Sequence, residues 1–389
     1  MKHDLRYGGT YAGKQELDAI IKSVTQSIRT GNWQAGEQAK LFEQEAADFL
    51  GVKHGVLTTS GSCAGLLALS ALELPKGSEV IIPAVTFPTI FNIILQCNLV
   101  PVVVDVGTDY VLDVDVIEDA ISKKTKAIIA VHALGYPVDM KHLMKIAKKN
   151  NLKVIEDNCD GWGGSIGGKK LGAWGDVSIT SFHGAHIVST AGTGGGVFTN
   201  DAELAQKVRM YKDWGRQADT TKPNVYRELP ADYNPRFIYE KIGYNFQTLE
   251  LQAAMGRIQL QKADKIKKLR QRNANCLIRE LSKFEELILP SPDVKNADIC
   301  WFSLPITTIG DRGLLVKHLE DNGIETRSMF SGNIIVHPAY RDSDYKVPGP
   351  LDNANYILEH SFWITVNPRL RKSDLDYIVS VFKSFYGKN

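Results

Sequence analysis

The stretch SITSFHGAHIVSTAGTGGGVFT, residues 178–199, decides the fold of this chain. A short apolar and β-branched run ends at Ser181 and Phe182, and a glycine-rich turn leads from there into a second such run. The preceding segments contain four more continuous apolar runs, EVIIPAV (79–85), VPVVVDV (100–106), AIIAVHAL (127–134) and KVIEDNC (153–159). Runs that do not alternate with polar residues are typical of strands buried on both faces of a sheet.

Helical patterns separate several of these runs, as in AGLLALSAL (64–72), DVIEDAISKK (115–124) and DMKHLMKIAKKNN (139–151). Strands that alternate with helices predict an α/β fold with a mainly parallel sheet flanked by helices. In such sheets ligands bind beyond the carboxyl ends of the strands. We therefore expect the functional residues of this chain at strand ends.

The alternation of strand and helix patterns ends at about Thr248. Residues 249–284 form one long helical pattern, apolar near its start and basic further on, which we interpret as a connecting helix with a solvated face rather than a basic binding patch. Strand patterns at 301–308 and 323–328 and an amphipathic helix at 374–386 follow. These features predict a large domain over 15–255 and a smaller α+β domain over 256–389, with the segment 1–14 packing on the latter.

Composition excludes several classes of protein. The 389 residues are 43% hydrophobic and 23% charged with a net charge of +2, so neither nucleic acid nor an anionic membrane is an expected partner. The first ten residues lack an apolar region, and no apolar run approaches the roughly 18 residues that span a bilayer. We expect a cytoplasmic protein. The five cysteines are scattered and odd in number, which favours reduced thiols and predicts no metal site.

Two short motifs could bind a cofactor. TTSGSCAG (58–65) places Gly61 and Ser62 where a turn opens a helix, and helix N-terminal amides with serine hydroxyls can bind a phosphate. The alternative is an ordinary helix cap. VIEDNCD (154–160) places Asp157 at the end of a buried strand, where a carboxylate could pair with a pyridinium nitrogen. The alternative is an acid that caps the following loop.

Two further features concern aromatic and imidazole rings. PAVTFP (83–88) ends in Phe87, which could stack on a flat cofactor or simply belong to the core. In SFHGAH (181–186), His183 and His186 follow a strand end beside a hydroxyl and a glycine-rich turn. A lone histidine is more often structural, but this combination favours a catalytic one.

Five segments in this order resemble the DegT/DnrJ/EryC1/StrS sugar aminotransferase family, which has pyridoxal-phosphate fold type I. They are SGSCA (60–64), PAVTF (83–87), ED (156–157), SFHGAH (181–186) and GYN (243–245). The resemblance implies a cofactor pocket and a homodimer with shared sites. It assigns Gly61, Ser62 and Ser181 to the cofactor phosphate, Phe87 and Asp157 to its ring, and Asn245 to the neighbouring subunit's phosphate. Asp160 and His183 are the remaining candidate cofactor-binding residues, and His183 is expected to shape the pocket without moving protons.

The chain departs from that family at the lysine that anchors pyridoxal phosphate. His186 occupies the position, and no lysine occurs from 171 to 206. Imidazole cannot form the Schiff base that lysine forms, yet it remains a base near neutral pH. The resemblance therefore extends to 3-dehydratases of nucleotide-linked 4-keto-6-deoxy sugars, which carry this substitution, work with pyridoxal or pyridoxamine phosphate and serve dideoxysugar and O-antigen lipopolysaccharide biosynthesis. KDWGRQ (212–217) and SGNIIVHPAY (331–340) also resemble that subfamily.

One branch of the subfamily holds a [2Fe–2S] cluster on cysteines that follow the DWGR segment. Here residues 217–235 contain no cysteine, and Cys159 alone matches a ligand position. The chain is therefore similar to the cluster-free branch, like GDP-4-keto-6-deoxymannose 3-dehydratase, in which L-glutamate is the amino donor. Three alternatives stay open: a nucleotide-sugar aminotransferase whose lysine was replaced, a catalytically silent sugar-nucleotide-binding homologue, and a dehydratase that passes electrons to a reductase partner by another route.

Overall fold

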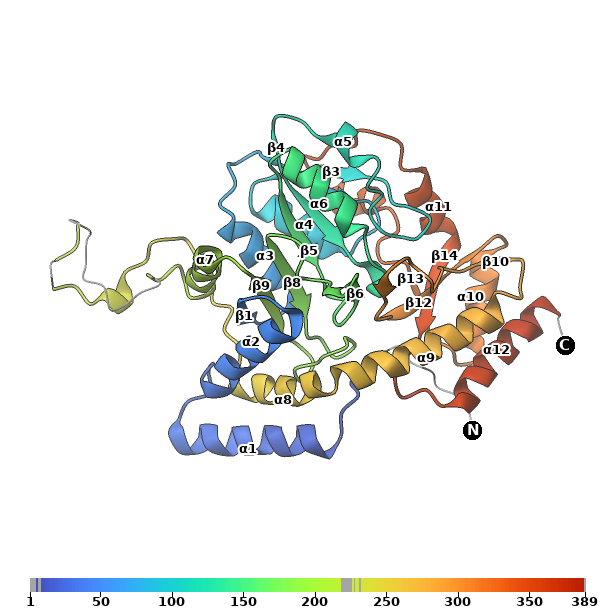
Figure 1. Ribbon diagram of the computed structural model, residues 1–389, viewed down its shortest axis with the longest axis horizontal. Coiled ribbons are helices and arrows are strands. Elements are labelled where there is room, and N and C mark those ends of the chain that lie inside the picture. Colours follow the sequence, from blue (N-terminus) through green and yellow to red (C-terminus); the bar gives the residue numbers. More distant parts are fainter. Residues whose placement is uncertain (1–4, 6–7, 218–225, 227, 231, 388–389) are drawn as a thin grey trace.

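The computed structural model describes residues 5, 8–217, 226, 228–230 and 232–387 (Figure 1). Its larger sheet has seven strands in the order β1-β9-β8-β5-β4-β2-β3. The strands are β1 (His54–Thr58), β2 (Glu79–Pro83), β3 (Val100–Val104), β4 (Thr125–Val131), β5 (Lys153–Asp157), β8 (Val177–Ser181) and β9 (Gly195–Thr199). Within this sheet β9 runs antiparallel to both neighbours, and the other adjacent strands pair in parallel. The predicted α/β fold with a mainly parallel sheet is confirmed.

Helices flank the larger sheet and bury its central strands along nearly their whole length. They are α2 (Glu37–Leu50), α3 (Gly61–Ala71), α4 (Pro88–Gln96), α5 (Ile117–Ala120), α6 (Met140–Lys149) and α7 (Ala202–Lys212), with a 3₁₀ turn η1 (Ala133–Gly135). The helix predicted over 115–124 is mostly wrong, since only α5 is helical. The N–H of Ser122 donates to the Thr125 hydroxyl at 2.9 Å, and this local bond competes with continuation of the helix.

The long helix predicted over 249–284 is two helices, α8 (Glu250–Gln261) and α9 (Ala263–Leu281). At the junction the N–H of Lys262 bonds the carbonyl of Gln259, three residues back, at 3.0 Å. This tighter turn separates the two helices. The expected solvated basic face is also wrong in part, because Lys267 and Arg270 are buried against the rest of the protein.

The C-terminal part builds a second, antiparallel sheet in the order β10-β12-β14-β13. Its elements are β10 (Leu287–Ile288), β12 (Ser303–Thr308), α10 (Arg312–Asp321), β13 (Thr326–Ser328), η3 (Ile334–Val336), η4 (Pro338–Tyr340), α11 (Asp352–His360), β14 (Ser361–Thr365) and α12 (Lys372–Tyr386). A small third sheet pairs β11 (Ala297–Asp298) of this C-terminal part with β6 (Ser165–Ile166) and β7 (Lys169–Lys170), which lie in the chain between β5 and β8. The domain boundary near 255 stays a prediction.

The N-terminal residues cross between the two parts. The N–H of Leu5 donates to the carbonyl of Gly323 at 2.9 Å, and the Asn367 amide donates to the carbonyl of Gly9 at 3.3 Å. Helix α1 (Lys14–Thr30) then lies beside α8 (Figure 1). Among the described residues, no helix combines the length and apolar character needed to cross a membrane.

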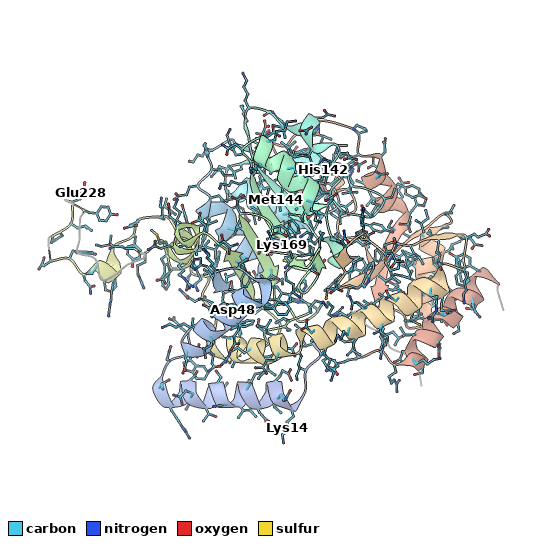
Figure 2. All side chains as sticks on the ribbon, viewed as in Figure 1. Lys14, Asp48, His142, Met144, Lys169 and Glu228 are labelled. Atoms are coloured by element: carbon cyan, nitrogen blue, oxygen red, sulfur yellow. The ribbon has the colours of Figure 1, made fainter. Side chains whose placement is uncertain are left out.

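The segment between α7 and α8 projects from the body of the molecule as an arm, drawn yellow-green in Figure 1. It contains the short turn η2 (Pro235–Phe237), and Glu228, labelled in Figure 2, lies far out on it. Part of the cysteine-free segment 217–235 belongs to this arm, and residues 218–225, 227 and 231 of it lie outside the described residues.

Candidate functional site

A cavity of about 350 Å³ opens at the carboxyl ends of the parallel strands, next to the start of the smaller sheet. Asp157 ends β5 and Ser181 ends β8, so two predicted residues reach it directly from the sheet. The structure brings together eight of the nine residues that the sequence assigns to the site. They are Gly61, Ser62, Phe87, Asp157, Asp160, Ser181, His183 and His186.

One end of the cavity is the N-terminus of α3. The side chain of Ser60 caps the helix by accepting a hydrogen bond from the N–H of Cys63 at 3.1 Å, so a helix cap is present. Ser62 instead lines the cavity, and its hydroxyl lies 2.7 Å from that of Thr89. A Cβ on Gly61 would lie 2.8 Å from the Cβ of Ser181, so glycine allows these two walls to approach. Helix amides and hydroxyls of this kind suit a phosphate.

The middle of the cavity offers one aromatic ring and one buried carboxylate. Phe87 is 57% exposed and lines the cavity, so the alternative of a core aromatic is wrong. Asp157 is buried, and its Oδ1 accepts a hydrogen bond from the N–H of Cys159 at 3.0 Å. Burial raises the pKa of Asp157, because a charged carboxylate is poorly solvated there. A cationic ring nitrogen would compensate that cost.

A buried network fixes the strand that carries Asp157. The preceding residue, Glu156, accepts hydrogen bonds from the backbone N–H groups of Gly172, Trp174 and Gly175 at 2.8, 2.5 and 2.7 Å. The N–H of Val138 donates to Nδ1 of His132 at 3.3 Å, so we assign the ring proton to Nε2, which lies 3.2 Å from Glu156. Glu156 is thus a structural acid, whereas Asp157 faces the cavity.

His183 and His186 lie in the loop that follows β8. The N–H of His183 donates to the Ser181 hydroxyl at 3.2 Å, and the N–H of His186 donates to the His183 carbonyl at 3.0 Å. The side chain of His186 is 14% exposed. Its Nδ1 lies 3.5 Å from Oδ1 of Asp160, yet this buried nitrogen has no hydrogen-bond partner among the described residues.

The electrostatics of this pair are strongly perturbed. Burial lowers the pKa of His186 to about 3, with the charges of His183 and Arg270 acting in the same direction. Burial and the neighbouring carboxylate of Asp157 raise the pKa of Asp160 to about 8. A neutral imidazole and a proton-holding carboxyl therefore face one another across the cavity floor. Perturbed titratable groups in a cleft are typical of active sites.

The structure does not place Asn245 in the cavity. Asn245 is exposed, and it pairs with Asp213 at the base of the arm. Conversely, the sequence patterns did not assign several other lining residues to the site, namely Ser60, Thr89, Val131, His132, Thr193, Gly194, Phe302, Phe330 and Trp363. Phe302, Phe330 and Trp363 come from the smaller sheet and its loops, and no local signal relates them to the strand ends of the larger sheet.

Comparison with known proteins finds similar chains of nearly the same extent. The chain is 36% identical to the lipopolysaccharide biosynthesis protein RfbH of Salmonella typhimurium, over 98% of this chain and 91% of that protein. It is 38% identical to the dTDP-4-dehydro-2,6-dideoxy-D-glucose 3-dehydratase of Saccharopolyspora spinosa, over 91% and 81%. It is also 32% identical to the GDP-perosamine synthase of Caulobacter vibrioides, over 76% and 77%.

Solved structures show the same fold. A crystal structure of a GDP-4-keto-6-deoxymannose-3-dehydratase (ColD) mutant with bound GDP-perosamine matches with a TM-score of 0.89 and 26% identity, over 98% of this chain and 100% of that one. The E. coli GDP-4-keto-6-deoxy-D-mannose-3-dehydratase with bound hydrated PLP matches equally well, with a TM-score of 0.89, 26% identity and the same shares of both chains.

The residues of the cavity fit pyridoxal phosphate. Hydroxyls and helix amides line one end, Phe87 and the buried Asp157 line the middle, and the unsatisfied Nδ1 of His186 lies at the floor. A model of the DegT/DnrJ/EryC1/StrS aminotransferase family matches residues 14–383, almost the whole chain. This chain belongs to the DegT/DnrJ/EryC1/StrS aminotransferase family, whose cofactor is pyridoxal phosphate.

Proposed function

We propose that this enzyme is a 3-dehydratase that removes the C3 hydroxyl of a nucleotide-linked 4-keto-6-deoxyhexose. The observation that carries the proposal is the position of His186 at the cavity wall, where the family places its lysine. No lysine is among the described residues that line the cavity. A site that keeps a base but has no amine cannot anchor its cofactor covalently, and this favours elimination over amination.

The residues at one end and in the middle of the cavity bind and orient the cofactor. Gly61, Ser62 and Ser181 hold its phosphate, as the helix N-terminus of α3 and two cavity-lining hydroxyls suit. Phe87 covers one face of the ring. Asp157 pairs with the ring nitrogen, since a buried carboxylate of raised pKa is stabilised by a cation.

The remaining residues act near the reacting atoms. When bound, the cofactor supplies a flat electron-withdrawing ring. His186 removes the proton that starts elimination and returns a proton to the departing hydroxyl. Because its Nδ1 lies against Asp160, we assign this proton transfer to Nε2. Asp160 and His183 line the pocket beside the imidazole, with Oδ1 of Asp160 3.5 Å from its Nδ1.

L-glutamate is the proposed amino donor that returns pyridoxamine phosphate to the enzyme after each turnover. The absence of cysteine from 217–235 supports this over a bound iron–sulfur cluster. The nucleotide-linked 3-deoxy product would enter dideoxysugar and O-antigen lipopolysaccharide biosynthesis. Similarity to the lipopolysaccharide biosynthesis protein RfbH supports that placement.

The proposed active unit is a homodimer. Asn245 is exposed at the base of the arm and outside its own cavity, as expected of a residue that completes a neighbour's phosphate site. The arm also exposes large apolar side chains, with Ile242 at 97% and Tyr239 at 53%. Exposed apolar surface of this kind favours burial against another chain.

Amination of the same class of keto sugar is the second candidate function, favoured by the similarity to GDP-perosamine synthase. Purified protein with pyridoxamine phosphate, L-glutamate and a panel of CDP-, dTDP- and GDP-linked 4-keto-6-deoxyhexoses separates the candidates by mass spectrometry of the sugar product. A 3-deoxy sugar supports dehydration, and an amino sugar supports amination. Binding of a nucleotide sugar with neither product supports a catalytically silent homologue.

A further inference from the structure

Arg270 is a buried cation that the residues assigned to the reaction do not include. It lies on α9 and is 3% exposed. Its guanidinium donates hydrogen bonds to three backbone carbonyls, those of Phe302 at 2.5 Å, Ala185 at 3.2 Å and Trp301 at 3.5 Å. Two of these acceptors, Trp301 and Phe302, immediately precede β12, and the third, Ala185, immediately precedes His186.

Arg270 and His186 also pack on the same aromatic ring, that of Phe302. The guanidinium carbon lies 5.8 Å from the centre of the Phe302 ring, and that ring lies 5.1 Å from the imidazole of His186 at an angle of 38°. Arg270 therefore holds both the backbone before His186 and the aromatic ring that packs on its imidazole. A planar guanidinium can hold two such segments in a fixed relation, whereas lysine presents one point charge.

The charge of Arg270 is not explained by an ion pair. Its Nε is buried without a hydrogen-bond partner among the described residues. Burial lowers the pKa of Arg270 to about 10, so the group stays charged at neutral pH. A buried cation without a bonded carboxylate costs stability, which points to an electrostatic role in the site.

We infer that Arg270 is a positioning residue for His186: it fixes the loop and the ring on which the imidazole rests, and it places a positive charge behind them. The charged groups that face the imidazole are His183 on its own loop, Asp160 after β5 and Arg270 on α9. A cation there disfavours imidazolium, so His186 rests in its neutral form. The inference rests on the proposed role of His186 as the base.

The test follows the protonation of His186 directly. The histidine ring nitrogens of ¹⁵N-labelled, cofactor-free protein are titrated by NMR from about pH 4 to pH 8, and His186→Asn identifies the signal. Native His186 is expected to stay neutral over this range. In Arg270→Met, which removes the charge at similar volume, the charged form is expected to appear at the acidic end, a rise in pKa of roughly one unit.

Two variants complete the design. Arg270→Lys keeps the positive charge but loses the planar guanidinium that bonds several carbonyls at once. His186 should therefore stay neutral, while kcat falls about 10- to 100-fold with KM nearly unchanged. Arg272→Met is the control, because Arg272 is exposed on the same helix and donates to the carbonyl of Leu370 at 2.9 Å, away from the cavity. It should leave both readouts unchanged.

An Arg270→Met protein whose His186 titrates as the native residue does would overturn the inference. So would a shift of equal size in Arg272→Met. If Arg270→Met does not fold, Arg270→Lys decides: native kcat in that variant refutes the positioning role. The NMR titration needs no turnover, so its failure is distinct from a failure of the proposed dehydration, which the product assay reports.

Discussion

Nδ1 of His186 lies 3.5 Å from Oδ1 of Asp160, and the two groups are perturbed in opposite directions. The pKa of the imidazole is about 3 and that of the carboxyl is about 8, so near neutral pH a proton resides on Asp160 and His186 is the free base. The proposed role of His186 as general base, in a cavity lined by no lysine among the described residues, is the chemical basis of the predictions below.

His186→Asn should abolish dehydration and leave cofactor binding intact. Asparagine has a similar volume but cannot accept and return a proton, and general acid–base groups contribute about 10²- to 10⁴-fold. The measurement is the rate of 3-deoxy sugar formation, with cofactor affinity measured separately by absorbance.

His183→Phe is the matched control, because His183 lines the same cavity three residues earlier. It should be mild. If His183→Phe abolishes turnover while His186→Asn leaves it intact, the catalytic assignment is reversed. His186→Lys should suppress elimination, since the restored amine would bind the cofactor covalently.

The stability of cofactor-free protein should depend on pH through this pair. Unfolding would raise the pKa of His186 from about 3 to 6.5 and lower that of Asp160 from about 8 to 3.8. Between about pH 4 and 6.5 the two proton changes cancel. From pH 6.5 to 8 the folded state binds the extra proton, so stability falls as pH rises.

Single variants should separate the two opposing dependences of stability on pH. In Asp160→Asn only the histidine remains, so the melting temperature should rise between about pH 4 and 6.5. In His186→Asn only the carboxyl remains, so the melting temperature should fall between about pH 4 and 8. Calorimetry at fixed ionic strength checks both. Profiles parallel to that of the native protein would mean that the pair does not titrate as described.

The cofactor should bind without a covalent link. Borohydride treatment of the holoenzyme followed by peptide mass spectrometry should leave every lysine unmodified, because none is among the described residues lining the cavity. His186→Lys provides the positive control and should acquire a pyridoxyl group at position 186. A specific adduct on a native lysine would place the active site elsewhere.

Asn245→Ala should weaken cofactor binding while the chain still dimerises, because the lost amide would serve the neighbouring subunit's phosphate site. Equilibrium titration with pyridoxal phosphate measures the affinity, and sedimentation measures the assembly. Gln247→Ala is the control, since the Gln247 amide donates to Asp213 of its own chain at 2.9 Å. A fully active monomer would refute both the shared site and the homodimer.

Much of the fold and site could be predicted because the signals are local. The buried strands have continuous apolar runs, and parallel strands bring their carboxyl ends to one edge, so Asp157 and Ser181 had to approach one another. The glycine between Ser60 and Ser62 marks a turn into a helix, and the histidine five residues after Ser181 marks a departure from the lysine pattern. Each signal lies within about ten residues of the group it describes.

The sequence by itself therefore determined the α/β fold, the family and eight residues that line the cavity, to which the proposed phosphate and base roles are assigned. Only the tertiary structure decided what surrounds His186. Arg270 and Phe302 lie more than 80 residues from His186 in the chain, and only folding brings Arg270 on α9 into hydrogen bonds with the carbonyls of Phe302 and Ala185. Solvation and charge depend on every group packed nearby, whatever its position in the chain, so the pKa values of His186 and Asp160 could come only from the folded arrangement.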